Sequence, residues 1–281
     1  EGNPEHPGSL GGSCIYSQAS LLDMYDPDRS QVVMQRGTPN SWQGFVEAVR
    51  TSVEENGKDG GAGLRFLTPT ITSPSMQAQF ARILTEMPNA KWVQYEPINN
   101  DNAMAGAKLA FGSPAHPVYR IDKATRILSI DADILSGPNS RYTHDFATGR
   151  SVSEEDKEMN RLYSIETTLS LVGAKADHRL AAKPSQVYEI VKAVAKAKDL
   201  SENRSKSLVF VGDNQPPEVH AAAYAINSIL GNIGETIIFT DPLSVNSERS
   251  QLDQLKELVA DIDAGRVKTL VILGGNPAYN T

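Results

Sequence analysis

Apolar runs of strand length alternate with amphipathic helical stretches along the last third of the chain, and this alternation restricts the possible folds more than any other feature. The strands are expected at residues 207–211, 236–239 and 269–273. The helices between them are expected at 217–230 and from an N-cap at Ser250 up to Gly265. Because continuous apolar strands are typical of burial on both faces, the pattern predicts three parallel strands joined by crossover helices.

The middle of the chain repeats this order less regularly. We predict an α/β fold with two doubly wound, Rossmann-like parallel-sheet layers, in a fragment of a larger molecule. The predicted divisions are a loop-rich N-terminal segment at 1–40, a first α/β domain at 41–200 and a second, incomplete α/β domain at 201–281, with a polar linker at 200–206. Further strands are expected at 64–67, 91–95, 126–130 and 162–165, and further helices at 41–55, 74–85, 102–111 and 184–198.

Composition excludes several classes of function. With 281 residues, of which 40% are hydrophobic and 22% charged, the chain has the balance of a globular protein. Its apolar runs are far shorter than the roughly 20 residues that span a bilayer, so no membrane span is expected. The net charge of −7, without a basic block, disfavours nucleic acid as a partner.

The ends of the chain indicate a piece of something longer. It begins at Glu1 and stops at Thr281 shortly after a strong apolar run. No basic segment followed by an apolar stretch opens it, so no export signal is expected within it. Cys14 is the only cysteine, which rules out an internal disulfide.

The loops that follow the strands are where we expect a ligand, since ligands of open parallel sheets bind beyond the carboxyl ends of the strands. Glycines there let main-chain N–H groups approach a phosphate, and carboxylates can accept ribose or guanine hydrogen bonds. Ordinary turn formation explains any one loop equally well. None is a GxGxxG or Walker A loop, so an ordinary NAD or ATP site is not indicated. The candidates are Asp131, Gly137, Glu166, Gly212, Asp213, Asn214, Gln215, Gly274, Gly275 and Asn276.

The sequence gives little indication of a metal site or of a catalytic nucleophile. The five histidines stand singly without HExxH spacing, and Cys14 has no companion, so no self-contained zinc or iron-sulfur site is expected. Asp131 and Asp133 alternate along the chain and should point to opposite faces, away from a common Mg²⁺. No GxSxG elbow is present. We expect His220 to face solvent beside the start of its helix.

Several short sequence motifs, spread over essentially the whole chain, resemble the molybdopterin oxidoreductase superfamily. Those at 1–7, 12–14, 18–20 and 22–29 resemble its N-terminal segment, and those at 176–180 and 273–277 are similar to its cofactor-edge loops, in the expected order. The resemblance adds Asp177 and His178 to the candidate cleft residues. It is strongest to the molybdopterin-like N-terminal half of the large iron-sulfur subunit of bacterial alternative complex III, a quinol:electron-acceptor oxidoreductase, through the words at 19–31, 119–124, 160–163 and 215–221.

This resemblance implies a setting and partners. In such subunits the second half is a ferredoxin-like domain that carries several iron-sulfur clusters, and the subunit serves electron transport in a respiratory chain. We therefore expect an iron-sulfur domain and other subunits of a membrane respiratory complex as partners. The resemblance also implies a location on the periplasmic side of the bacterial inner membrane.

Departures from the family pattern bear on the cofactor. Cys14 stands where catalytic members place the fourth thiolate of a four-iron cluster, but three earlier cysteines are missing, and a lone thiolate cannot hold a cluster. Ala103 takes the position that resembles the molybdenum-ligating cysteine, and alanine has no lone pair to donate. Ser185 lies where a Pro-Gly-Thr-Asp turn would grip guanine. Each departure removes a contact that fixes metal or nucleotide.

Three hypotheses follow. The first is a molybdopterin-type domain without its cofactor that acts as a structural and docking platform, with no cofactor expected in this chain. The second is a working oxidoreductase that binds a bis-molybdopterin guanine dinucleotide through backbone loops, with molybdenum held by dithiolenes and oxo or water groups. The third is a generic nucleotide- or sugar-binding α/β enzyme. We further expect Arg29 and Arg161 to form structural ion pairs between the two layers, with solvated surface positions as the alternative.

Overall fold

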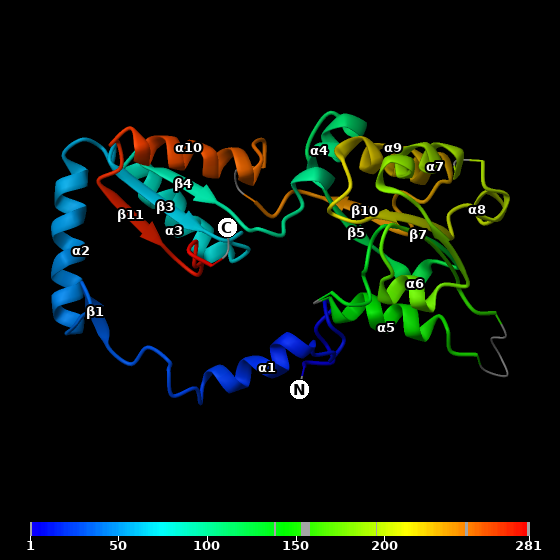
Figure 1. The fold of residues 1–281 in the computed structure, drawn as a ribbon, viewed down its shortest axis with the longest axis horizontal. Helices are drawn as coiled ribbons and strands as arrows, with labels where there is room; N and C mark the ends of the chain where they lie inside the picture. Colours follow the sequence, from blue (N-terminus) through cyan, green and yellow to red (C-terminus); the bar gives the residue numbers. More distant parts are fainter. Residues whose placement is uncertain (1, 138, 153–157, 195, 245–246, 280–281) are drawn as a thin grey trace. The chain divides into compact units, whose positions relative to one another are not determined.

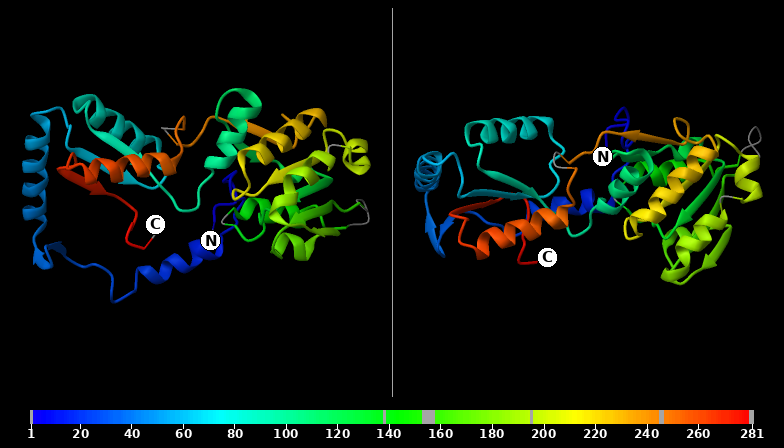
Figure 2. Two further views of the ribbon diagram at one scale, coloured as in Figure 1. Left: turned by 45° about the horizontal axis from the view of Figure 1, so that its top comes forward. Right: turned by 90° about the horizontal axis from the view of Figure 1, so that it is seen from above.

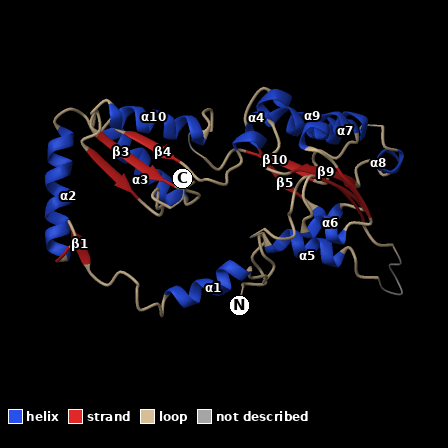
Figure 3. Ribbon diagram, viewed as in Figure 1, coloured by secondary structure: helices blue, strands red, loops and turns tan. Residues whose placement is uncertain are grey.

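The computed structural model describes residues 2–137, 139–152, 158–194, 196–244 and 247–279 (Figure 1). The chain forms two compact units. Unit 1 comprises Glu1–Leu22 and Asn100–Pro242, and unit 2 comprises Asp23–Asn99 and Leu243–Thr281. Figure 3 distinguishes the helices from the strands. Both units combine a parallel sheet with covering helices, so the predicted α/β fold with parallel-sheet layers is confirmed.

A four-stranded parallel sheet forms the centre of unit 1. Its order is β8-β7-β6-β9, so β8 and β9 lie at its two edges. β9 is buried along its whole length and β6 at all but its first residue, as their continuous apolar runs require. The strands are β6 (Arg126–Ile130), β7 (Arg161–Glu166), β8 (His178–Ala181) and β9 (Ser207–Val211).

Helices cover both faces of this sheet, as the views in Figures 1 and 2 show. Ile127 faces a cluster with residues of α5 and α6, whereas its neighbour Leu128 faces a second cluster with residues of α7 and α9. The period of two along a strand explains this division. The helices are α5 (Ser140–Thr148), α6 (Leu171–Lys175), α7 (Val187–Val194), α8 (Lys198–Glu202) and α9 (Pro217–Ile229), with the 3₁₀ turns η1 (Ile121–Lys123) and η2 (Pro184–Gln186).

Unit 1 also contains a helix pair and a two-stranded antiparallel ribbon. The helix α4 (Asp101–Phe111) packs against α9 through Gly106, where an added Cβ would lie 2.4 Å from the Cβ of His220. The ribbon joins β5 (His116–Tyr119) to β10 (Ile237–Thr240). Small residues on α4 therefore permit the close approach of the two helices.

Unit 2 has a three-stranded parallel sheet of order β11-β3-β4. On one face Phe80 of α3 stacks on Trp92 at 4.1 Å, and on the other Leu258 of α10 packs with Leu67 and Val93. The sheet strands are β3 (Leu64–Thr68), β4 (Lys91–Gln94) and β11 (Thr269–Ile272), covered by α3 (Pro74–Glu86) and α10 (Gln251–Asp263). Towards the N-terminus the chain forms α1 (Ile15–Asp23), the hairpin of β1 (Val33–Gln35) and β2 (Thr38–Asn40), and α2 (Trp42–Gly57).

The expected pairing of the last three strands is wrong. β9 pairs in parallel with β6, β10 pairs antiparallel with β5, and β11 pairs in parallel with β3. Apolar runs specify burial but not the neighbour, and each of these strands is completed by a partner from far earlier in the chain.

The units also differ from the divisions expected at residues 40 and 200, since both are discontinuous in sequence. β11 carries residues 269–272 into the sheet of unit 2, whereas β9 and β10 belong to unit 1. The helix expected at 184–198 is divided into the turn η2, the helix α7 and, from Lys198, the helix α8. Local apolar periodicity does not reveal these breaks.

Candidate functional site

Three of the predicted residues, Asp131, Gly212 and Gln215, meet at the carboxyl edge of the sheet in unit 1. Asp131 follows β6, and its carboxylate accepts hydrogen bonds from the main-chain N–H of Thr167 (2.8 Å), the Thr167 hydroxyl (2.9 Å) and Nε2 of Gln215 (2.8 Å). Gly212 follows β9, and its N–H donates to the carbonyl of Ile130 at 3.0 Å. Asp131 therefore ties the ends of β6, β7 and β9 together.

Glycine is required at residue 212 by the close approach of two loops. A Cβ at this position would lie 2.0 Å from the carbonyl oxygen of Asp131. Asp131 itself has φ of +49°, a left-handed conformation that aspartate tolerates better than most residues. The glycine here serves contact between protein segments.

Glu166, at the end of β7, is only 2% exposed. Desolvation raises its pKa, but the hydrogen bond from the Ser170 hydroxyl (2.6 Å) and the ion pair with Arg179 outweigh it, so the net pKa shift is downward. A Cβ at Gly173 would overlap the Glu166 carboxylate. This carboxylate is enclosed by protein groups and offers no oxygen to a ligand of any size.

The remaining candidates on this edge differ in their contacts. The carbonyl of Asp213 accepts a hydrogen bond from Nδ2 of Asn102 at 3.1 Å. Desolvation raises the pKa of the Asp213 carboxyl, although the residue as a whole is exposed. Asn214 is exposed, and Gly137 has open space around the position of a Cβ.

His220 was expected to face solvent, and that expectation is wrong. The residue is 1% exposed, in the first turn of α9, and neither ring nitrogen forms a well-aligned hydrogen bond to the described residues. Desolvation lowers its pKa to about 4, against a smaller opposing effect of the main chain of Gly212 and Gln215. Close packing against Gly106 of α4 is what buries it.

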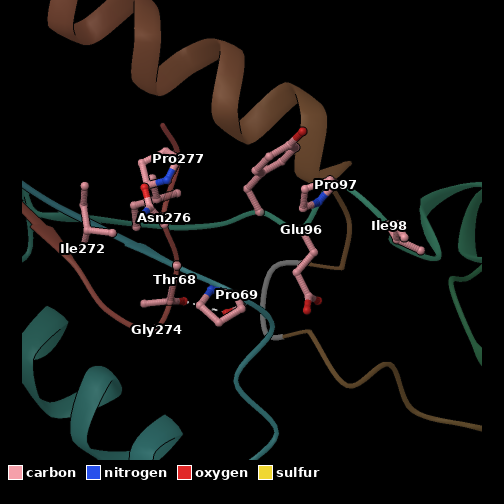
Figure 4. A pocket seen from close by; sticks show the side chains of 12 residues that line it. Thr68, Pro69, Glu96, Pro97, Ile98, Ile272, Gly274, Asn276 and Pro277 are labelled. Carbon is pink, nitrogen blue, oxygen red and sulfur yellow. Dashed lines mark hydrogen bonds between the residues drawn. The ribbon is translucent and has the colours of Figure 1, made fainter. Parts of the chain in front are cut away.

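A second group of predicted residues lines a pocket in unit 2. Three strand ends meet there: Thr68 ends β3 and Pro69 follows it, Glu96 follows β4, and the segment 274–277 follows β11 (Figure 4). The pocket has a volume of about 330 Å³, near the lower limit for small-molecule sites. Gly274, Gly275 and Asn276 therefore share a pocket with strand-end residues of unit 2, whereas Asp131 and Gly212 belong to unit 1.

The polar groups around this pocket are partly engaged. The Thr68 hydroxyl donates to the carbonyl of Pro69 (2.8 Å) and accepts from Nε1 of Trp92 (2.9 Å). The Glu96 carboxylate accepts a hydrogen bond from the Thr70 hydroxyl. Gly274 has φ of +71°, which favours glycine in this turn. The pocket therefore offers one carboxylate and the main chain of a glycine-rich turn.

One residue near this pocket escaped sequence reasoning. Gln251 is 2% exposed; its Oε1 accepts from the main-chain N–H of Glu96 (2.7 Å) and its Nε2 donates to Thr70 (3.0 Å). It begins α10 and lies on the same stripe as Gln254 and Leu258, which are also buried. The spacing of Gln251 and Gln254 with Leu258, on one face of the helix, could have indicated from the sequence that these glutamines are buried.

Asp177 and His178 lie apart from both groups. The Asp177 carboxylate accepts from the main-chain N–H of Leu162 (2.8 Å) and pairs with Arg150 (2.8 Å). Asp177 directly precedes β8 and contacts the start of β7, because Tyr163 is in register with His178. The resemblance placed these two residues with the strand-end cleft, and in unit 1 they lie at the opposite edge of the sheet from Asp131.

The two positions tied to metal binding do not fit that role. Ala103 is 3% exposed within α4, and its carbonyl accepts a hydrogen bond from the Tyr224 hydroxyl of α9 at 3.4 Å. Cys14 is partly exposed, and its thiol contacts the Ser17 hydroxyl at 3.2 Å. Nowhere in the described ranges do three or more His, Cys, Asp or Glu side chains gather as metal ligands. The donor set of these residues does not fit molybdenum or an iron-sulfur cluster.

The two arginines expected to form structural ion pairs between the layers occupy exposed positions instead. Arg29 is exposed. Arg161 has a side chain that is 44% exposed, and it pairs with Asp199 of its own unit at 3.2 Å. A buried ion pair exists elsewhere, between Arg65 and Asp261, whose side chains are 4% and 3% exposed and 2.8 Å apart.

Among the helices formed by the described residues, none combines the length and hydropathy that crossing a bilayer requires.

Comparison with known proteins finds similarity to solved structures but not to curated sequences. No family model matches the chain, and no curated protein sequence matches it. Acetylene hydratase from Pelobacter acetylenicus is similar with a TM-score of 0.54 and 11% identity, over 84% of this chain and 40% of that one. The likeness is one of fold. This chain spans less than half of the hydratase chain.

A second solved structure is similar over a comparable part of the chain. It is the formyltransferase/hydrolase complex FhcABCD from Methylorubrum extorquens in complex with methylofuran, with a TM-score of 0.54 and 16% identity, over 82% of this chain and 75% of that one. At these identities the likenesses show the fold alone. That fold is a Rossmann-like α/β architecture with parallel sheets.

Proposed function

We propose that this chain is a molybdopterin-oxidoreductase-like domain of a respiratory electron-transfer subunit, that it holds no molybdenum cofactor, and that it acts as a structural and docking platform. The observation that carries the proposal is the surroundings of Ala103. Its methyl group is buried in α4, and its carbonyl is engaged by Tyr224. The side chain at this position has no atom that can donate to a metal.

The sheet edge of unit 1 supports the same proposal. Asp131 and Glu166 have their carboxylates engaged by Thr167, Gln215 and Ser170. Buried polar groups that already have partners stabilise the fold without a ligand. A domain of this kind keeps its structure with an empty cleft, and its surface remains free for a partner.

The resemblance of the sequence supplies the rest of the proposal. The partner is an iron-sulfur, ferredoxin-like domain, and electrons pass through its clusters. The complex lies on the periplasmic side of a bacterial inner membrane. These statements rest on the resemblance of the sequence motifs, since the structural similarities concern the fold alone.

Metal and pterin analysis of the full subunit, purified from its own membranes, tests the proposal. We expect molybdenum far below one atom per subunit by elemental analysis, and no pterin fluorescence after oxidative release. Restoring a thiolate with Ala103→Cys should leave the metal content unchanged, because the position is enclosed between helices. Stoichiometric molybdenum in the unaltered subunit would overturn the proposal.

The pocket of unit 2 favours a second candidate. A volume of about 330 Å³, a glycine-rich turn and the Glu96 carboxylate suit the binding of a ring system with hydrogen-bond donors. In this alternative the chain belongs to a functional oxidoreductase that binds a bis-molybdopterin guanine dinucleotide through main-chain groups. A pterin that copurifies in a one-to-one ratio, and is lost in Gly274→Val, would favour the alternative.

A further inference from the structure

The edge strand β8 combines an unpaired backbone with unusual exposure. Among the residues that the structure describes, no strand pairs with the side of β8 away from β7. All four residues of the strand are exposed, and Leu180 is exposed to 51%. An open strand edge presents N–H and C=O groups that can pair with another chain.

Beside this edge lies an apolar pocket of about 390 Å³. Leu180 is in register with Ile165 on β7, and both contribute to its wall, so the pocket lies on the α7 side of the sheet. The aromatic ring of Tyr163 stacks on the ring of His178 at 5.0 Å at one end. The other apolar walls are formed by Leu128, Val194 and Leu200.

Charged side chains often protect strand edges from pairing, and Arg179 is the charged residue in the middle of β8. Its guanidinium is paired with the buried carboxylate of Glu166, on the face of the sheet opposite the pocket. The arginine is therefore held by an intramolecular partner, and Leu180 is left uncovered beside the pocket.

Unpaired positive charge lies at both ends of the strand. Lys175 precedes β8, and Lys183 follows it; both are exposed, and neither forms an ion pair with a residue that the structure describes. The acidic neighbour Asp177 is already paired with Arg150. The edge thus has a basic side chain at each end and an apolar pocket beside its middle.

We propose that β8 is a docking edge for an extended, acidic segment of a partner protein, which adds to the sheet as a fifth strand. The added strand would lie about 4.8 Å from β8, and alternate side chains would point to the pocket side. One apolar side chain enters the pocket beside Leu180, and acidic residues at the two ends of the segment meet Lys175 and Lys183. Main-chain hydrogen bonds supply affinity and the pocket supplies specificity.

This proposal is independent of the cofactor question. The pocket beside β8 shares no lining residue with the pocket of unit 2, and Asp131 does not line it. A metal bound to the intact subunit would overturn the proposed function and leave the strand edge available. Conversely, failure at β8 would leave the cofactor proposal untouched.

The test is fluorescence anisotropy with the 281-residue chain and a labelled eight-residue peptide of alternating valine and glutamate. We expect saturable binding that falls at least about tenfold in Leu180→Asp. Leu252→Asp is the matched control, because Leu252 of α10 is exposed to a similar degree, 47%, and lies in unit 2. Joint reversal of Lys175→Glu and Lys183→Glu should weaken binding and make it insensitive to salt.

Changes in the peptide keep the test informative even if a variant folds poorly. A peptide with N-methylated main-chain amides on its pairing side should not bind, and a valine–lysine peptide should bind weakly. Equal binding of the N-methylated peptide, or unchanged binding in a folded Leu180→Asp chain, would overturn the proposal. So would self-association of the chain that disappears in Leu180→Asp, since the edge would then serve a second copy.

Discussion

Two residues of this protein are buried although the sequence predicts exposed or ligand-binding side chains. His220 looks from its sequence context like a surface histidine at the start of a helix, yet it is 1% exposed. Glu166 looks like a strand-end ligand, yet it is enclosed by Ser170, Arg179 and Gly173. In both cases a neighbouring segment, distant in sequence for His220, removes the side chain from solvent.

The buried histidine gives a pH-dependent stability. Its pKa in the folded state is about 4, below the ordinary value of 6.5, because desolvation disfavours the charged ring. As the pH falls below 6.5, the unfolded chain binds this proton first, so the free energy of unfolding decreases until the pH reaches about 4. The loss from this group is about 3 kcal/mol.

Urea denaturation between pH 7 and pH 4 measures this effect. In His220→Asn the free energy of unfolding should decrease less over this range than in the unaltered chain. The difference should be about 3 kcal/mol, the part that His220 contributes. His6→Asn is the control, because His6 is exposed and its replacement should leave the slope unchanged. The same pH slope in His220→Asn and in the unaltered chain would contradict the assignment.

At the scale of elements, local periodicity identified most helices and strands, but it did not identify partners. β6 and β9 lie at the predicted residues, and Ser250 caps α10 as predicted, through a hydrogen bond from the main-chain N–H of Asp253. The antiparallel pairing of β10 with β5 was missed, because an apolar run of three residues is compatible with either direction. Packing of α4 on α9 was also missed, since it depends on Gly106, which has no apolar side chain to signal it.

This helix pair yields a mutational prediction. Alanine at residue 106 would place a methyl group 2.4 Å from the Cβ of His220 and 2.9 Å from the carbonyl oxygen of Pro217. We expect Gly106→Ala to lower the free energy of unfolding by about 2 kcal/mol, because α4 and α9 must separate. Gly57→Ala, at the end of α2, meets nothing within 4 Å and should stabilise slightly through helix propensity. Opposite signs in denaturation curves are the expected result, and equal effects would show that the helices do not pack through Gly106.

At the scale of the whole molecule, each unit has its own core. The two apolar clusters around the four-stranded sheet draw their members from residues 107–239, and the two clusters of unit 2 draw theirs from 64–95 and 255–271. α1, at the beginning of the chain, has no buried residue. The apolar burial that stabilises a unit is therefore supplied within that unit.

This division predicts which fragments fold. Residues 100–242 contain every strand of the sheet in unit 1 and both of its clusters, so this fragment should unfold cooperatively and give a dispersed amide NMR spectrum. Residues 201–281 contain β9, β10 and β11 without any of their pairing partners, and should remain unfolded. The reverse outcome for either fragment would refute the division into these units.

The sequence by itself determined the α/β class, the positions of most elements and the presence of strand-end loops rich in glycine and acidic residues. These properties depend on periodicity and turn chemistry, which act over a few residues. Only the tertiary structure decided which strands pair, that Gly274 and Glu96 share one pocket while Asp131 and Gln215 close another sheet edge, and that Asp177 lies at the opposite end of its strands. Those arrangements depend on contacts between residues far apart in the chain, where many pairings satisfy the same local pattern and only packing of the whole core selects one.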